Sequence, residues 1–494
     1  MKIHFLIPPA GKERNPDRLF GCSYSFFLQH NIFILYPASC LKQKGFEVEL
    51  TDCVIEEKSL KDALNEEADA YVFYSVFLSR EIDLRTADTI QKKFKDKPII
   101  FIGSDPTIYP KKYCNKKNRF VIRGEPEETI LDLCNELKKN KQNFKKIKGL
   151  TFFNKKPLEN PTRPYIENLD KLPFPDRTLI KKPLKYSNPK FKKFPSTTML
   201  TSRGCAFRCS FCIPNSLSFA REVEWKRKFK QKPAVTKRSP KNIIGEFKLI
   251  KEQGYKSVFI IDDQFVWGKE RTIEILKGIR PFGLEIALLA RCDMLSDEDI
   301  VREMSLSNVK YVDLGIESFD QKILDDVRKD LKVESINKCV HNLKKYKIEP
   351  EVNVLLGCSP LETKETIKKT TKEVEKMNVD VVHATICTPF PGTDFRELAL
   401  EKGWIITGKQ DYIPIDPGAD SLISYPHLSR EELIKSVKRI YRRHYFSPKY
   451  LFKQLISTRS LLELKNKLRA ASGIFKNIFI LKNEKKKPKT KREQ

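Results

Sequence analysis

Three closely spaced cysteines constrain this chain more than any other feature of its sequence. Cys205, Cys209 and Cys212 lie in the segment SRGCAFRCSFC, directly after the run TTMLT at residues 197–201. Thiolate is a soft ligand, so zinc and iron–sulfur clusters are the two metal centres to consider. A trio without a fourth Cys or His nearby can fill three positions of such a centre, and it leaves the fourth position open.

The open position separates the two metal interpretations. Structural zinc normally takes four protein ligands, and most clusters are also bound by four cysteines. A cluster held by three cysteines would leave one iron free for a small molecule, which suits catalysis. The alternative is that the cysteines are small hydrophobic core residues. The adjacent Gly204 and the two arginines of the segment are unusual in such a core, so we interpret the trio as a metal site.

The pattern CxxxCxFC resembles the signature of the radical S-adenosylmethionine (SAM) family. In that family three cysteines hold a 4Fe-4S cluster, and SAM binds the open iron through its amino and carboxylate groups. Reductive cleavage of SAM then yields a 5'-deoxyadenosyl radical. The resemblance therefore implies a radical SAM enzyme with these three cysteines as metal ligands.

Length and composition set further limits. With 494 residues the chain is too long for one ordinary core, so we expect two or three domains. Its twelve cysteines do not form a disulfide framework and no signal segment opens the chain, so we expect a reducing cytoplasm. Residues 19–41 lack Asp, Glu, Lys and Arg and are long enough to span a membrane. Because polar residues and Pro37 interrupt them, we interpret them as a buried loop and helix of a soluble domain, with a span as the alternative.

Short apolar strands alternate with helical patterns over residues 1–145. We expect strands at residues 2–7, 45–50, 70–75, 98–103 and 119–124. This alternation predicts a doubly wound parallel sheet, whose ligands bind beyond the carboxyl ends of its strands. Small residues at those ends would let a bulky cofactor approach the backbone. The candidate cofactor-binding residues are Ser75, Gly103, Ser104, Gly124 and Glu125.

These turns resemble the cobalamin-binding domain that often precedes a radical SAM barrel. GSDPT at residues 103–107 lies where the family has a GGxHPT-like turn, RGEPEET at residues 123–129 is close to its RGExEET segment, and NLDKLPFP at residues 168–175 matches its linker. The resemblance implies bound cobalamin. No DxHxxG motif follows the first strand, so the corrinoid would lack a histidine as lower ligand. A flavodoxin-like domain that has lost its ligand is the alternative.

A second series of strands follows a linker at residues 146–195. Besides the run before the cysteines, we expect strands at residues 256–263, 285–291, 311–317, 351–357 and 381–389, and a basic loop at residues 222–241. Six βα units over residues 196–405 are consistent with the partial (βα)6 barrel of the family, and barrel enzymes place their chemistry at the carboxyl ends of strands. Asp263, Arg291 and Glu317 lie there. By similarity, Asp263 would contact the methionine amine of SAM, Arg291 its carboxylate and Glu317 its ribose. The alternative is that each of them is a solvated charge on a loop.

The remaining cysteines read as core residues, and we assign no role to the isolated His341, His383 and His427. Residues 406–481 are expected to form a helical extension, with a basic disordered tail at residues 482–494. From Arg439 onward the chain has 17 Lys and Arg against 3 Asp and Glu, a net of +14 out of +30. Apolar residues recur at helical spacing from Leu461 to Ile478, so we expect this segment either to dock on an anionic membrane or to pack against the barrel.

The sequence thus predicts an enzyme that uses a 4Fe-4S cluster, SAM and cobalamin, together with an external electron donor. The resemblance implies methyl transfer to, or ring formation at, an unactivated carbon of a small substrate, for which the basic amphipathic extension suggests a lipid or another hydrophobic metabolite. Two alternatives remain open: a radical SAM enzyme that modifies tRNA, and a zinc-stabilised nucleic-acid-binding protein without catalysis. Neither a second cysteine cluster nor an RNA-binding module is recognisable, so nucleic acid is not the expected partner.

Overall fold

The N-terminal part of the chain forms a doubly wound sheet. The computed structural model describes residues 1–10, 14–21, 23–25, 27–139, 142–186, 188–406 and 420–457. The strands of the first sheet are β1 (Lys2–Ile7), β2 (Glu47–Asp52), β3 (Ala70–Tyr74), β4 (Ile99–Ile102), β5 (Arg119–Ile122), β6 (Leu150–Asn154) and β7 (Lys156–Glu159). They lie in the order β2-β1-β3-β4-β5-β6-β7, and β1 to β5 are parallel. The five predicted parallel strands are therefore present.

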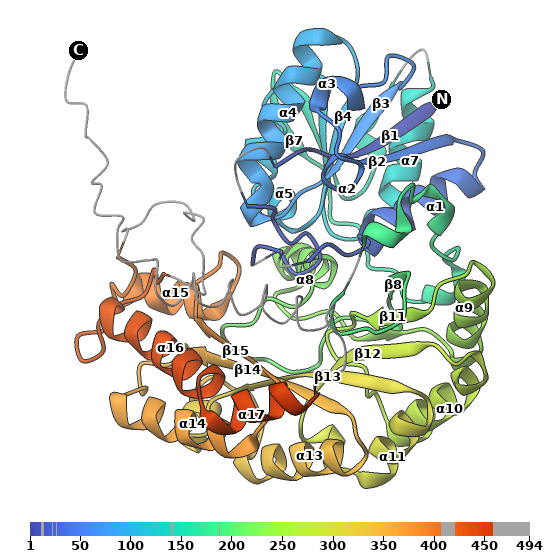
Figure 1. Ribbon diagram of the computed structural model, residues 1–494. Helices are drawn as coiled ribbons and strands as arrows, with labels where there is room; N and C mark the ends of the chain where they lie inside the picture. Colours follow the sequence, from blue (N-terminus) through green and yellow to red (C-terminus); the bar gives the residue numbers. More distant parts are fainter. Residues whose placement is uncertain are drawn as a thin grey trace.

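Helices cover both faces of this sheet (Figure 1). They are α1 (Ile32–Gln43), α2 (Cys53–Glu56), α3 (Leu60–Ala63), α4 (Arg80–Lys93), α5 (Ser104–Ile108), α6 (Pro110–Tyr113) and α7 (Glu127–Leu137). Strands β3, β4 and β5 are buried along their whole length, as expected for parallel strands between two helical layers. The stretch without charges is a loop followed by α1, which begins at the N-cap Asn31. No helix in the described part of the chain is long and apolar enough to cross a membrane.

Two short strands extend the first sheet into the expected linker. β6 and β7 form an antiparallel hairpin that adds to β5, and Lys155 at its turn has a left-handed backbone with φ +60°. The linker predicted for residues 146–195 therefore contributes its first part to the sheet. The hairpin escapes sequence reasoning because four- and five-residue strands at an edge leave little periodic signal.

The second sheet is the predicted six-stranded partial barrel. Its strands are β8 (Ser196–Met199), β11 (Ser257–Ile260), β12 (Glu285–Ala290), β13 (Val309–Glu317), β14 (Glu349–Leu356) and β15 (Val381–Ile386). All are parallel, in the order β15-β14-β13-β12-β11-β8. A small ribbon of β9 (Ser202–Arg203) and β10 (Thr236–Lys237) lies beside it. Its helices are α8 (Ser216–Phe229), α9 (Pro240–Glu252), α10 (Lys269–Ile279), α11 (Glu298–Leu306), α12 (Gln321–Asp326), α13 (Val333–Lys345), α14 (Lys364–Met377) and α15 (Asp394–Glu401).

The structure corrects the basic loop expected at residues 222–241. Residues 222–229 belong to α8, whose N-cap is Asn215 and whose C-cap Lys230 has a left-handed conformation. α8 lies between the two domains (Figure 1) and has no single solvent-exposed face. Charged residues such as Arg221 and Glu224 are buried in it, so the amphipathic pattern of a surface helix is missing.

The C-terminal extension contains α16 (Arg430–Tyr445), which packs against β15 (Figure 1), and α17 (Pro448–Ser457), which packs against α16. Ser429 caps α16, since its side chain accepts a hydrogen bond from the Glu432 amide. The phenol oxygens of Tyr441 and Tyr445 accept hydrogen bonds from the backbone of Ala384 and Val382 at 3.2 and 3.0 Å. These side chains satisfy the edge of β15, where the next strand of a closed barrel would pair. The expected disordered tail at residues 482–494 and the stripe from Leu461 to Ile478 lie outside the described residues.

Candidate active site

The cysteine loop, residues 202–212, begins with β9 and leads toward α8 at the carboxyl end of the barrel strands. Backbone hydrogen bonds hold its middle in place: the Ser210 amide donates to Val327 O at 3.0 Å, and the Phe395 amide donates to Ser210 O at 2.9 Å. All three cysteines are free thiols and are partly exposed. The loop is therefore a fixed element whose sulfurs remain reachable by a ligand.

The three cysteines are compatible with a cluster. No group of three His, Cys, Asp or Glu side chains within the described ranges converges on one metal position. Cluster-bound cysteines each bind a different iron, so they need not converge on a single point. Burial raises the pKa of Cys205 to about 11, with the Asp263 carboxylate adding to the effect. A metal centre must therefore displace protons from this site when it binds.

Asp263, which follows β11, holds the beginning of the cysteine loop. Its Oδ2 accepts from the Gly204 amide at 3.2 Å, and its Oδ1 accepts from the Asn215 amide at 2.7 Å. Burial raises the pKa of Asp263 to about 6. Gly204 is required here because φ is +92° and an added Cβ would lie 2.7 Å from Arg221 Nη1. The predicted SAM-binding carboxylate thus lies at the cysteine loop and orients it.

Arg291 lies against the same loop after β12. Its guanidinium carbon is 3.5 Å from the centroid of the Phe207 ring, and Phe207 lies between the first two cysteines. Arg291 Nε donates to Asp293 Oδ1 at 3.0 Å, and Nη2 donates to Asp330 O at 2.8 Å. The structure therefore brings Arg291 and the cysteine loop together, as the strand-end prediction requires.

Glu317 ends β13 in a strained conformation. Its φ is +59°, which is rare outside glycine, and the pairing of β13 with β14 shifts at this point. The Lys329 ammonium donates to Glu317 Oε1 at 2.7 Å, and both side chains are only 10% exposed. Burial alone would lower the pKa of Lys329, but the Glu317 carboxylate outweighs this and raises it. Strain of this kind is common at functional sites.

Two lysines beside the cysteines escape sequence reasoning. Besides Lys329, Lys232 donates to Phe207 O at 2.9 Å and pairs with Glu222 at 3.1 Å. Burial opposes charge on Lys232, yet Glu222 and the nearby thiols raise its pKa. In a lysine-rich chain neither residue carries a local signal, because only the fold brings them to the loop.

The edge of the N-terminal sheet holds the other predicted residues. Ser75 and Ser104 are at most 1% exposed, and their hydroxyls have no hydrogen-bond partner within the described part of the chain. Gly103 has φ +112°, and an added Cβ would lie 2.4 Å from Ser75 O. Orphaned buried hydroxyls at the carboxyl ends of β3 and β4 fit a ligand that forms hydrogen bonds.

Gly124 and Glu125 lie where this edge meets the barrel. Glu125 Oε1 accepts from Arg203 at 3.0 Å, and its Oε2 accepts from the Ile166 amide at 2.6 Å. Gly124 approaches α8, because an added Cβ would lie 3.3 Å from Glu224. The Tyr74 hydroxyl at the end of β3 is 2.8 Å from Ser216 of α8. Glu125 is thus an inter-domain ion-pair residue, and α8 covers part of the edge.

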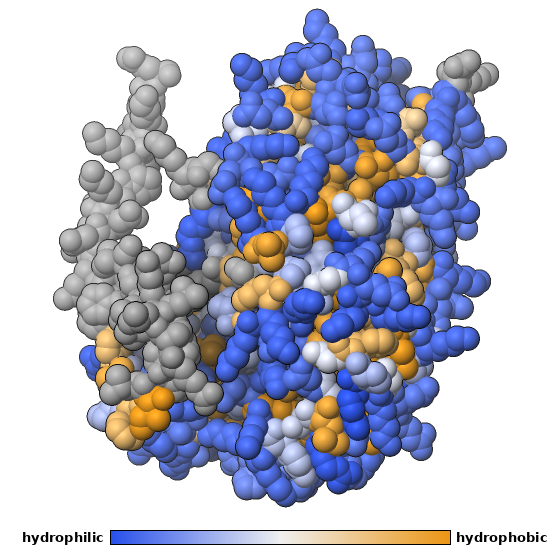
Figure 2. Space-filling model, turned by 45° about the vertical axis from the view of Figure 1, so that its right-hand side comes forward, coloured by the Kyte–Doolittle hydropathy of each residue, from blue (hydrophilic) through white to orange (hydrophobic). Residues whose placement is uncertain are grey.

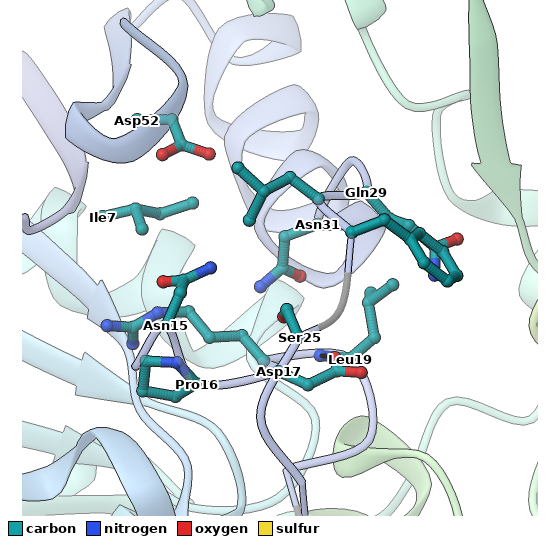
Figure 3. A pocket seen from close by; sticks show the side chains of 12 residues that line it. Ile7, Asn15, Pro16, Asp17, Leu19, Ser25, Gln29, Asn31 and Asp52 are labelled. Atoms are coloured by element: carbon teal, nitrogen blue, oxygen red, sulfur yellow. Dashed lines mark hydrogen bonds between the residues drawn. The ribbon is translucent and has the colours of Figure 1, made fainter. Parts of the chain in front are cut away.

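A polar cavity opens at the ends of β1 and β2 (Figure 3). It has a volume of about 40 Å³ and is lined by Ile7, Asn15, Pro16, Asp17, Arg18, Leu19, Ser25, Phe27, Leu28, Gln29, Asn31 and Asp52. Figure 3 shows the Asn31 amide pointing toward Asn15 and Ser25. Asn31 Nδ2 and Arg18 Nε are buried donors without a partner among the residues described. Sequence reasoning missed this cavity because its polar residues lie in a loop without a motif.

Comparison with known proteins identifies the barrel. Residues 199–374 match the radical SAM superfamily. The chain is 27% identical over 466 residues to an uncharacterised methyltransferase of Pyrococcus horikoshii, covering 92% of this chain and 95% of that protein. It is also 25% identical over 340 residues to an anaerobic magnesium-protoporphyrin IX monomethyl ester cyclase of Rubrivivax gelatinosus, covering 67% of this chain and 57% of the cyclase.

Solved structures share the fold. The structure of OxsB, described as a cobalamin-dependent SAM radical enzyme, has a TM-score of 0.70 at 15% identity. The match covers 97% of this chain and 72% of the OxsB chain. TsrM of Kitasatospora setae, a radical SAM methyltransferase, has a TM-score of 0.61 at 16% identity, with 82% and 77% covered. The cysteine signature, the six-stranded barrel and the match over residues 199–374 together show that this chain carries a radical SAM domain, the domain of a superfamily whose enzymes use a 4Fe-4S cluster and SAM.

Proposed function

We propose that the chain is a cobalamin-dependent radical SAM enzyme that methylates, or forms a ring at, an unactivated carbon of a hydrophobic substrate. One observation carries this proposal. The carboxyl edge of the N-terminal sheet faces the cysteine loop, since Glu125 after β5 pairs with Arg203 and Tyr74 of β3 contacts α8. A corrinoid on that edge and a cluster on the loop would both border the same inter-domain region.

The barrel residues divide into two roles in this proposal. Cys205, Cys209 and Cys212 would hold the cluster. Asp263, Arg291 and Glu317 would face the amine, carboxylate and ribose of SAM, because a carboxylate suits an ammonium or hydroxyls and a guanidinium suits a carboxylate. SAM would then compete with Asp293 for Arg291 and with Lys329 for Glu317.

The N-terminal sheet would hold the corrinoid. The orphaned hydroxyls of Ser75 and Ser104 support a hydrogen-bonding ligand at the ends of β3 and β4, and the orphaned donors Asn31 and Arg18 support the same at β1. Without a DxHxxG motif, no histidine of that motif would bind cobalt from below. When bound, the three cofactors supply a carbon radical and a methyl group, while the protein orients them and excludes water.

Methyl transfer and ring formation are both supported by relatives. The Pyrococcus horikoshii relative is named as a methyltransferase and covers nearly the whole chain, whereas the Rubrivivax gelatinosus relative is a cyclase. We favour methyl transfer because the match to the methyltransferase is longer. An external electron donor is required in either case, since SAM cleavage consumes an electron.

Contact with a membrane is part of the proposal for the substrate. α17 exposes Leu451, Phe452 and Ile456 at 52, 66 and 66%. The face drawn in Figure 2 is largely hydrophilic, with scattered apolar patches. An apolar helix face in a basic segment is typical of peripheral membrane binding, which would bring the enzyme to a lipid or another hydrophobic molecule.

The test is anaerobic biochemistry with purified protein. We expect about four irons per chain, binding of hydroxocobalamin, and release of 5'-deoxyadenosine when SAM and a reductant are added. Methyl transfer also releases S-adenosylhomocysteine, so turnover with deoxyadenosine alone would favour ring formation. Comparing the lipids and pigments of a host with and without the gene identifies the substrate. Iron-loaded protein that releases no deoxyadenosine under any of these conditions would refute the proposal.

A further inference from the structure

A buried ion-pair cluster joins the two proposed cofactor sites. Arg203, one residue before Gly204 and two before Cys205, donates from Nη1 to Glu125 Oε1 at 3.0 Å and from Nη2 to Glu127 Oε1 at 2.6 Å. The Arg203 and Glu127 side chains are 1% exposed and that of Glu125 is 4% exposed. One guanidinium therefore binds two carboxylates of the other domain with almost no solvent between them.

The cluster is connected to both domains through backbone groups. Glu127 is the first residue of α7, and the second oxygen of Glu125 accepts from the Ile166 amide of the linker. On the barrel side, Arg221 of α8 donates to Arg203 O at 3.3 Å and lies 3.6 Å from Glu125. An added Cβ at Gly204 would lie 2.7 Å from Nη1 of the same Arg221, and the backbone there has φ +92°. Arg203 and Arg221 thus connect the sheet edge at Glu125 to the backbone that precedes the first cysteine.

A buried cluster of ion pairs adds little to the stability of an interface. Desolvation of buried charges offsets most of their attraction, and apolar residues of similar volume stabilise an interface as well or better. A guanidinium fork shared by two carboxylates instead fixes distance and direction. Glu127 Oε2 has no partner in the described part of the chain, so the arrangement is not optimised for binding energy.

We infer that Arg203 is a positioning residue that sets the cysteine loop relative to the carboxyl edge of the N-terminal sheet, with Glu125 and Glu127 as its anchors. The inference rests on the proposed function, because it assigns the purpose of that alignment to a corrinoid and a cluster that act on one substrate. It concerns the loop rather than the chemistry, so it predicts an effect that is visible without turnover.

The test combines two readouts on full-length, iron-loaded protein. The first is amide hydrogen exchange of residues 202–212. Glu127→Gln is nearly isosteric and Arg203→Lys keeps the charge, and we expect each to speed exchange in this loop about tenfold or more, because a charged hydrogen bond is lost. The second is spin-relaxation enhancement of the reduced cluster by Co(II) corrinoid, which reports their separation and which we expect both variants to change.

Controls separate positioning from general destabilisation. Arg177→Lys alters a pair with Glu246 that is equally buried, at 2.7 Å and 0% exposure, but lies outside the cysteine loop. It is expected to leave both readouts at wild-type values. The charge swap Arg203→Glu with Glu127→Arg is expected to restore slow exchange relative to Arg203→Glu alone, since it rebuilds one pair in reverse.

The outcomes distinguish the inference from the proposed function. If wild-type protein binds no corrinoid, the proposed function fails, while the exchange measurement still decides whether Arg203 orders the loop. If corrinoid binds but exchange and relaxation in Arg203→Lys and Glu127→Gln match wild type, the inference is overturned. It is also overturned if Arg177→Lys disturbs the loop equally, since the effect would then be a general loss of stability.

Discussion

The pair of Glu317 and Lys329 allows a quantitative test of the site. The two side chains are 2.7 Å apart and each is 10% exposed, so solvent screens their attraction little. Breaking a buried pair by removing one partner costs about 3–5 kcal/mol, because the other charge stays buried without compensation. We therefore expect Lys329→Met to destabilise the barrel by about 3 kcal/mol. The double variant Lys329→Met, Glu317→Gln removes both charges and is expected to lie within about 1–2 kcal/mol of wild type.

The assay is a double-mutant cycle on iron-free protein. The stability of each variant is measured by urea-dependent hydrogen exchange of the β13 amides. The expected coupling energy is about 3 kcal/mol or more, because each single variant should be less stable than the double variant. Lys345→Met is the matched control, because Lys345 and Glu298 form a similar pair at 50 and 47% exposure. Exposed pairs contribute about 1 kcal/mol or less, so this control should change stability little.

The same variants test the proposed role of Glu317 toward SAM. Glu317→Gln should weaken SAM binding to the iron-loaded protein about tenfold, because a charged hydrogen bond to a ligand hydroxyl is worth roughly 1.5–3 kcal/mol. Additive single effects below about 1 kcal/mol each would mean that solvent reaches the pair, and the electrostatic reasoning would be wrong. Unchanged SAM affinity in a folded Glu317→Gln protein would remove Glu317 from the ligand site.

Four further outcomes are expected. Alanine at all three cysteines of the cysteine loop should abolish iron binding while far-ultraviolet circular dichroism stays unchanged, and retained iron would contradict the site. Ser75→Ala should weaken hydroxocobalamin binding in an absorbance titration without loss of stability, because its hydroxyl has no described partner, whereas Gly103→Ala should also destabilise the domain by about 2–4 kcal/mol through its clash with the Ser75 carbonyl. Full-length protein should sediment with anionic liposomes at low salt and a truncation from Tyr450 should not; equal behaviour of the two would assign the stripe to the core. Glu351 raises the pKa of His383 against the opposing effect of burial, so the stability lost in His383→Gln should be largest below pH 6.5 and should shrink as pH rises through the higher folded-state value.

Local patterns in the sequence were sufficient to predict most of the elements and to propose the cysteine trio as metal ligands. The parallel strands of both sheets could be predicted from short apolar runs, because parallel strands between helical layers are largely buried, whereas the antiparallel hairpin of β6 and β7 could not. Asp263, Arg291 and Glu317 could be proposed because each lies at or just after the end of a strand, and parallel strands bring their carboxyl ends to one edge. The spacing of the cysteines involves only residues that are close in sequence, so the motif can be recognised before the fold is known.

Tertiary structure decided which side chains meet. Arg203 and Glu125, which form an ion pair, are 78 residues apart in the sequence. Lys329 lies near the cysteine loop because the chain after β13 brings it back to Glu317 at the end of that strand. His383, which looked isolated, pairs with Glu351 at 2.6 Å across two neighbouring strands. The burial of α8 between domains likewise erased the amphipathic signal that would have predicted a helix. Ion pairs and inter-domain contacts depend on how segments that are distant in sequence are placed relative to each other. Hydrophobic periodicity shows which face of a segment is buried but not which residues it contacts, so it cannot predict these pairs.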